Sequence, residues 1–172
     1  MLFVWYTLDM QEKESLREEL IFHLTVGHAH MTFEEAVADF PLDKINTVFT
    51  NGDYTFWHLL EHIRRTQNDI LDFMINANYK EIAWPDDYWP GKEEKATKKE
   101  WDKTIASFIS DRNQLKELIQ DPQTDLYKKI PHGTGQTVMR EIIVVTDHNA
   151  YHLGEFAIMR QVLDAWGKRK RK

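Results

Sequence analysis

The chain has 172 residues, a formal net charge of −6 and no cysteine. Its length suits a single domain, residues 1–172, with a sizeable core, and its acidic balance argues against nucleic acid as a main partner, because binding phosphates requires a basic surface. Without cysteine the chain has no disulfide, no thiolate metal ligand and no cysteine nucleophile, which is typical of a reducing compartment.

The N-terminal segment 1–7 is apolar, but it is too short to cross a bilayer and lacks the basic start of a signal peptide. We therefore expect a soluble, cytoplasmic protein that does not bind a membrane. The basic run 168–172 at the other end of the chain is expected to be a solvated, disordered tail.

Apolar residues recur at helical spacing in four long stretches. A shorter stretch between the first two has the same character and is ended by Pro41. Gly167 is placed to end the last helix. The predicted long helices span about 11–29, 53–78, 97–121 and 137–166, and the short helix spans 32–40.

Hydroxyl and carboxyl side chains mark the predicted helix starts, because their oxygens can accept a hydrogen bond from a free N–H of the first turn. Thr32 and Thr97 are each followed three residues later by a glutamate, which is the capping-box pattern. Thr137 is the expected N-cap of the last helix, and either Asp53 or Thr55 is that of the second long helix.

Four long amphipathic helices, without the period-two runs of strands, predict an all-α four-helix bundle. The connection between the second and third long helices, residues 79–95, is long. Within it the segment 84–91 holds three aromatic residues and two prolines. This segment is either a packed surface loop or the wall of a ligand pocket.

Histidines form two pairs at a spacing of four residues, His58/His62 and His148/His152. About 0.4 such pairs are expected by chance for eight histidines in a chain of this length. Both pairs fall inside predicted helices, where residues four apart share a face. In a four-helix bundle, metal sites are built from facing helices, so the pairs indicate a metal centre.

The pair His148/His152 shares a helix face with Glu155, and that face is otherwise apolar. Burying two imidazoles without partners is costly, and a shared metal ion removes that cost. His62 on the facing helix is the expected third ligand. Three histidines leave the metal an open coordination position, which is typical of a catalytic site. Imidazole suits Zn, Ni, Fe or Cu; we expect Zn or Ni, with Mn or Fe as alternatives.

A competing motif overlaps the first pair. His58-Leu-Leu-Glu61-His62 matches the His-x-x-Glu-His pattern of inverzincin peptidases. In that interpretation His58 and His62 bind zinc and Glu61 is the general base. It leaves the second histidine pair unexplained.

The other cationic residues have less specific expected roles. His28 and His132 could approach the mouth of a pocket, whereas Arg140 and Arg160 on the last helix are expected to form ion pairs with the excess of acidic residues.

Four segments together resemble the DinB-like (DinB/YfiT) family, over about residues 10–167. The resemblance implies a four-helix bundle and a metal triad with one histidine on the second helix and two on the fourth, which correspond here to His62, His148 and His152. The segments are FWHLLEHI at 56–63, WPDDYWP at 84–90, PHGTGQT at 131–137 and DHNAYHLGE at 147–155.

Family members with known activity are thiol-dependent enzymes, including mycothiol-dependent maleylpyruvate isomerase and bacillithiol S-transferase. The resemblance therefore implies a metal that activates a low-molecular-weight thiol toward a small electrophilic substrate. We expect Glu155 or Glu61 to orient a ligand or to accept a proton. The alternatives are a metal-dependent hydrolase, a non-enzymatic metal- or ligand-binding stress-response module and a purely structural bundle, and a homodimer is also expected. The residues assigned to the pocket are Trp57, His58, Trp89 and Tyr151.

Overall fold

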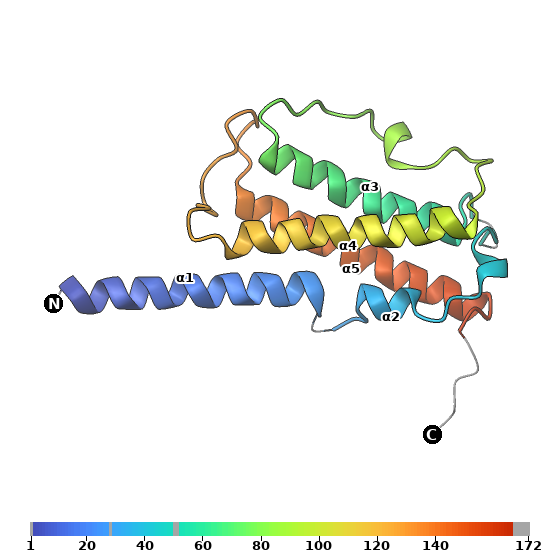
Figure 1. Ribbon diagram of the computed structural model, residues 1–172, viewed down its shortest axis with the longest axis horizontal. Coiled ribbons are helices and arrows are strands. Elements are labelled where there is room, and N and C mark those ends of the chain that lie inside the picture. Colours follow the sequence, from blue (N-terminus) through green and yellow to red (C-terminus); the bar gives the residue numbers. More distant parts are fainter. Residues whose placement is uncertain (1, 28, 50–51, 167–172) are drawn as a thin grey trace, which may run out of the picture.

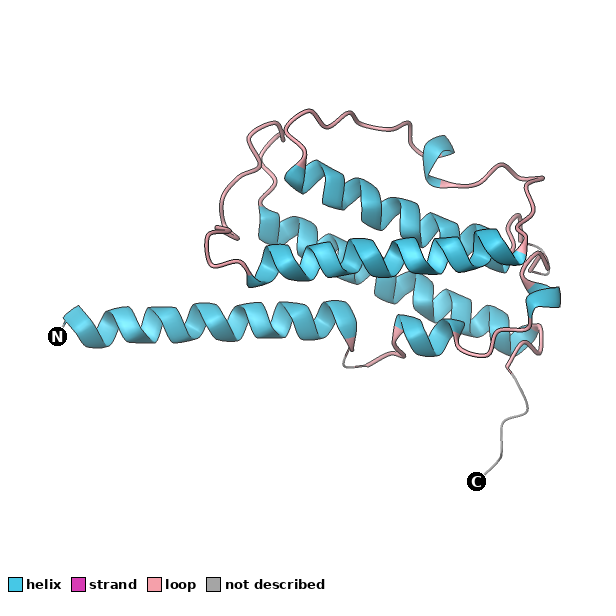
Figure 2. Cartoon of the chain, in the orientation of Figure 1, coloured by secondary structure: helices cyan, strands magenta, loops and turns pink. Residues whose placement is uncertain are grey.

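The structure is a computed structural model that describes residues 2–27, 29–49 and 52–166, with side chains from residue 13 onward. These residues form helices and loops, and their only β-type pairing is two isolated bridges (Figure 2). The predicted all-α class is therefore confirmed. The helices are α1 (Leu2–Thr25), α2 (Phe33–Val37), α3 (Phe56–Ile75), α4 (Lys98–Gln120) and α5 (Val138–Val162), with 3-10 turns η1 (Leu42–Lys44) and η2 (Asp86–Tyr88).

The four long helices pack as a bundle (Figure 1). Helix α3 packs against α4 and α5, α1 packs against the same two helices, and the short α2 packs against α5. The N-terminal part of α1 extends well beyond the other helices (Figure 1). A long connection runs from α3 to α4, as predicted, and contains η2.

The predicted N-caps of α2, α4 and α5 are confirmed, and of Asp53 and Thr55 the structure shows Thr55 as the N-cap of α3. The hydroxyls of Thr32, Thr55, Thr97 and Thr137 each accept a hydrogen bond from the backbone N–H three residues on. Each cap satisfies an N–H that the first helical turn cannot pair internally.

Several helix ends differ from the prediction. Helix α1 begins earlier and stops at Thr25 because Gly27 takes a left-handed conformation, with φ of 67°. Helix α2 ends at Val37, earlier than the predicted 40. Helix α3 stops before Asn76, whose side chain accepts from the N–H of Asn78 and thereby competes with the helix. Helix α5 ends at Val162, and Asp164, with φ of 47°, reverses the chain there.

Two hydrophobic clusters fill the bundle. One cluster lies toward α2 and the start of α3, and is rich in aromatic residues such as Phe56, Phe108 and Phe156. The other lies toward the end of α3, around Leu71 and Leu115. These clusters fix α3 against α4 and α5, and so fix the helix faces that carry the polar site.

Arg160 was expected to pair with an acidic residue, and this prediction is wrong. Its side chain is 1% exposed, and its guanidinium donates to the backbone carbonyls of Ala36, Ala38 and Ala165 at 2.6–3.1 Å. The guanidinium also lies 3.9 Å from the centre of the Trp166 ring. Arg160 therefore joins α2 to the chain beyond α5. Arg140 does form the expected ion pair, with Glu141.

Among the described residues, no helix combines the length and the apolar character needed to cross a membrane. Some predictions concern positions outside the described residues: His28, Gly167 as the end of the last helix, and the basic tail 168–172.

Replacing Arg160 should test whether its buried hydrogen bonds stabilise the fold. We expect Arg160→Lys to lower the free energy of unfolding by about 2 kcal/mol, because a single ammonium nitrogen replaces the three spaced guanidinium nitrogens that reach the carbonyls, and a buried carbonyl left unpaired is costly. Urea denaturation measures this change. The matched variant Arg140→Lys, at an exposed position, should change the free energy of unfolding by about 0.5 kcal/mol or less. Equal effects of the two variants would contradict the proposed role.

Candidate metal centre

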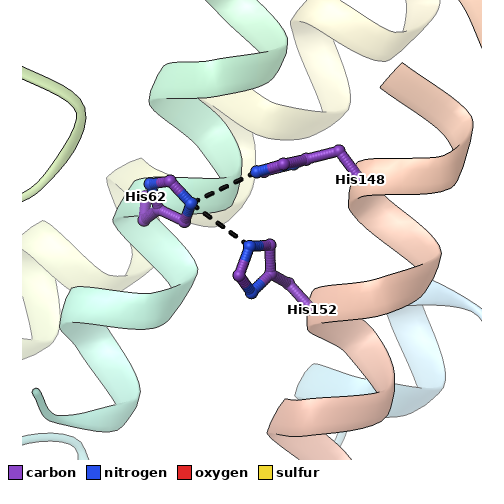
Figure 3. A group of neighbouring side chains, drawn as sticks. All are labelled: His62, His148 and His152. Carbon is purple, nitrogen blue, oxygen red and sulfur yellow. Dashed lines mark hydrogen bonds between the residues drawn. The ribbon is translucent and has the colours of Figure 1, made fainter. Parts of the chain in front are cut away.

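Three histidines from two helices converge on one point. His62 of α3 points toward His148 and His152 of α5 (Figure 3). The Nε2 atom of His62 lies 3.2 Å from Nε2 of His148 and 3.3 Å from Nε2 of His152. The ligand atoms of all three lie within 4.8 Å of one another. The structure thus brings together the three residues that were predicted as a metal triad.

The outer nitrogens of two rings are held by acceptors. Nδ1 of His62 lies 3.1 Å from the carbonyl oxygen of Tyr88, and Nδ1 of His152 lies 2.7 Å from Oε2 of Glu155. Because a carbonyl and a carboxylate only accept, both Nδ1 atoms must carry the proton. Nδ1 of His148 is buried and has no hydrogen-bond partner among the described residues.

Burial keeps two of the rings uncharged. Burial lowers the pKa of His62 to about 4, against the opposing effect of its hydrogen bond to Tyr88. Burial, followed by repulsion from His152 and His62, lowers the pKa of His148 to about 4. Both imidazoles are therefore neutral near pH 7, which is the form that binds metal.

The residues present fit a metal ion. Nδ1 of His62 and Nδ1 of His152 both donate outward, so the Nε2 atoms of these two rings face each other 3.3 Å apart. The Nε2 lone pair of a neutral His62 would be attracted to a cation held between the rings. Ligand nitrogens about 2.0–2.1 Å from a tetrahedral zinc are separated by roughly 3.3 Å, which matches the distances of 3.2 and 3.3 Å from Nε2 of His62 to the other two rings. The cluster is thus compatible with a metal site.

An aromatic wall borders the cluster. The ring of Trp89 stacks on His62 with centroids 3.9 Å apart and planes at 5°. Tyr54 lies against Trp89 at 5.4 Å, and its hydroxyl donates to Oε1 of Glu155. Burial first, and then this carboxylate, raise the pKa of Tyr54. Tyr54 therefore stays protonated and supports the carboxylate that orients His152.

Sequence reasoning missed Tyr54. It lies just before the helix that carries His62 and 101 residues from Glu155, and no spacing pattern links the two.

Of the four residues assigned to the pocket, the structure places Trp89 and Tyr151 beside the cluster. The ring of Tyr151 lies 4.9 Å from His152 and is 72% exposed. The other two lie elsewhere. The indole of Trp57 donates to Thr104 of α4, and His58 forms part of the N-terminal cap of α3.

The two candidate carboxylates are also in different places. Glu155 bonds to His152, and this hydrogen bond lowers the pKa of Glu155. Glu61 lies between α3 and α4, where it accepts from Arg64, Arg65 and Thr104. Burial raises the pKa of Glu61, but these contacts lower it further, so that the pKa lies below its ordinary value.

The competing His-x-x-Glu-His site is not formed. Nδ1 of His58 lies 3.4 Å from the backbone N of Thr55, and its Nε2 lies 2.9 Å from the carbonyl of Glu94. Both ring nitrogens are therefore occupied by the backbone. Since Glu61 is also engaged by two arginines, neither residue is placed for peptidase chemistry beside His62.

A comparison with protein-family models matches residues 26–156 to the DinB superfamily. The matched segment contains all three histidines of the cluster, together with Tyr54, Trp89 and Glu155. Comparisons with curated proteins and with solved structures found no match.

Metal titration tests the cluster directly. Protein treated with a chelator and dialysed should bind one equivalent of Zn²⁺, as measured by calorimetry. His62→Ala, His148→Ala and His152→Ala should each weaken binding by about 100-fold or more, because each removes one of three ligands. His30→Ala, at an exposed position, is the control. Absence of binding, together with an unchanged melting temperature of His152→Ala, would exclude the metal site.

The two carboxylates provide a second test. Glu155→Gln should weaken Zn²⁺ binding by about tenfold, because a neutral amide holds the Nδ1–H of His152 less strongly. Glu61→Gln should leave the affinity unchanged, since its carboxylate contacts α4 instead. The opposite order of effects would show that Glu61 supports the metal.

Acid should destabilise the metal-free protein. Between pH 6.5 and 4 the unfolded chain protonates His62 and His148, whereas the folded chain, with pKa values of about 4, does not. The free energy of unfolding should therefore fall as the pH falls through this window, by up to about 1.4 kcal/mol per pH unit for each histidine. Urea titrations at several pH values measure the slope of the free energy of unfolding against pH. This slope should be smaller for His148→Gln, and an unchanged slope would contradict the lowered pKa of His148.

Proposed function

Because the chain belongs to the DinB superfamily, we propose that it holds a divalent metal, Zn or Ni, at His62, His148 and His152, and uses it to activate a low-molecular-weight thiol toward a small electrophile. The observation that carries this proposal is the convergence of three Nε2 atoms on one point. The class of reaction would be S-transfer or isomerisation.

The ligands come from only two helices, which leaves room for a reactant. Helices α3 and α5 supply all three nitrogens (Figure 3), and His148 and His152 are only partly buried. A three-histidine centre with a free position is the arrangement found in catalytic zinc sites. A divalent metal held there would supply a Lewis acid that lowers the pKa of a bound thiol. The chain has no cysteine of its own, so the sulfur nucleophile must come from a small molecule.

The surrounding side chains have separate tasks in this proposal. Glu155 holds the Nδ1 proton of His152 and keeps its Nε2 directed inward. Tyr54 fixes the other oxygen of Glu155. Trp89 covers one face of His62 and excludes water from it. Tyr151, which is exposed beside His152, is placed to contact the incoming substrate.

The same geometry also supports a second candidate. A metal with a free position can activate water for hydrolysis, and Glu155 would then be the nearest group to accept a proton. A non-enzymatic metal- or ligand-binding module remains the alternative if neither reaction occurs. The cytoplasmic location and the homodimer stay predictions from the sequence.

Cobalt substitution separates these functions. In protein loaded with Co²⁺, a small thiol such as cysteine or 2-mercaptoethanol should produce an absorption band from sulfur-to-cobalt charge transfer. Conjugation of the thiol to 1-chloro-2,4-dinitrobenzene should be faster with the metal-loaded protein than with the metal-free protein. The matched control is His152→Ala treated in the same way.

The possible outcomes are distinct. A cobalt spectrum that does not respond to thiols would reject the thiol-dependent reaction. Hydrolysis of an activated ester such as 4-nitrophenyl acetate, lost in His152→Ala, would then favour the hydrolase. Metal binding with neither reaction would favour the binding module.

A further inference from the structure

A second cavity, separate from the histidine cluster, lies between the C-terminal part of α3 and the N-terminal turn of α5. Its volume is about 490 Å³, which is within the range of pockets that bind small molecules. It contains none of the three histidines of the cluster. The turn at 132–136 and the start of the long connection close its sides. This site is independent of the proposed function, because it does not depend on a metal.

The cavity has an acidic lining. Asp69, Glu81 and Glu141 contribute carboxylates, and among the described residues Arg140 is the only lysine or arginine that lines it. The charge of Arg140 is already matched, since its guanidinium pairs with Oε1 of Glu141. Among the described residues, no lysine or arginine forms an ion pair with Asp69 or Glu81. The balance of charge therefore favours a cation.

One carboxylate oxygen of Glu141 has no hydrogen-bond partner among the described residues. Its residue is 4% exposed, yet it lines the cavity. Oε1 is bound by Arg140, whereas Oε2 makes no hydrogen bond with any described residue. This oxygen is not among the buried side-chain atoms that lack a partner, so it is open to the cavity. A ligand carrying N–H donors can reach it there.

Aromatic rings form another part of the wall. Phe73 contacts Tyr79 and His132 edge-on, with ring centroids 5.1 and 5.2 Å apart. The turn lies close against this group, because a Cβ at Gly133 would come within 3.0 Å of Phe73. Aromatic rings attract organic cations through their quadrupoles. They also accommodate the alkyl part of such a ligand.

Asp69 is held in place by two tyrosines. The hydroxyls of Tyr79 and Tyr88 donate to its two oxygens at 2.9 and 2.6 Å. Burial, and then Asp69 itself, raise the pKa of both tyrosines, so they remain donors. The carboxylate is thus fixed at the cavity wall without a cationic partner.

The helix ends do not change this balance. The C-terminal end of α3 favours a cation and the N-terminal end of α5 favours an anion. Since both helix ends border the cavity, their electrostatic effects offset each other. The charged side chains therefore decide whether the cavity favours a cation or an anion. We propose that the cavity binds the ammonium group of a small organic amine, between the carboxylates of Asp69 and Glu141 and beside the ring of Phe73.

Tyr88 connects this cavity to the metal centre. Its hydroxyl holds Asp69, and its carbonyl accepts from Nδ1 of His62. Asp69 follows His62 by seven residues on α3, which corresponds to about 10 Å along the helix. An amine in the cavity would therefore lie along the same face of α3 as the cluster.

The test uses butylammonium as the probe, with butyrate and butanol as anionic and neutral analogues of the same length. The full chain is titrated in chelator-treated and in Zn²⁺-loaded form at constant ionic strength, with amide chemical shifts as the readout. Butylammonium should shift the signals of the 132–136 turn and of Phe73 saturably in both forms. Butyrate and butanol should shift them much less.

Two variants identify the carboxylates. Glu141→Gln should weaken butylammonium binding about tenfold, because the carboxylate loses its charge. Glu81→Gln should weaken it about threefold, since Glu81 is exposed; this variant keeps the test valid if Glu141→Gln does not fold. Glu117→Gln, on the exposed side of α4, should bind as the unaltered chain does.

Equal binding of butanol or butyrate would overturn the proposal. Butylammonium affinity that is unchanged in Glu81→Gln and in every folded preparation of Glu141→Gln would overturn it as well. Histidine variants that lose metal binding should still bind butylammonium. This result would support the amine site whether or not the proposed metal-dependent function holds.

Discussion

The convergence of three buried or partly buried imidazoles on one point is the constraint on which the rest of this structure depends. Nε2 of His62 meets Nε2 of both His148 and His152 at 3.2–3.3 Å, a spacing that suits the ligands of one metal ion. Two of the rings are oriented by hydrogen bonds from their Nδ1 atoms. His62 donates to the carbonyl of Tyr88, and His152 donates to the carboxylate of Glu155. The positions of the long connection and of Tyr54 follow from these two contacts.

Helix α3 organises the long connection as well as supplying a ligand. Arg65 donates to the carbonyls of Asp87 and Trp89, and Asp69 accepts from Tyr79 and Tyr88. Two turns of one helix therefore fix the segment that places Trp89 on His62. The acidic, aromatic cavity lies on the same face of α3, about two turns beyond His62.

The two histidine pairs show how far a spacing pattern can be trusted. Both members of His148/His152 reach the cluster because they lie in the middle of α5. In the other pair only His62 does. His58 is the third residue of α3, where backbone N–H groups lack partners inside the helix, and its ring turns back to the N–H of Thr55. Equal spacing thus gives different roles in the middle and at the start of a helix.

The sequence by itself determined the all-α class, three of the four capping threonines, the long connection and the three histidines, because these depend on local periodicity, on first-turn hydrogen bonding and on which residue types bind metal. It did not determine which helix face each polar residue uses across the bundle. Tyr54 beside Glu155, Glu61 turned toward α4, Arg160 buried among carbonyls and the cavity around Glu141 are contacts between segments far apart in the chain. Only the packing of α3 against α4 and α5, and of α2 against α5, decides them, because partners that meet across a bundle leave no regular spacing in the sequence.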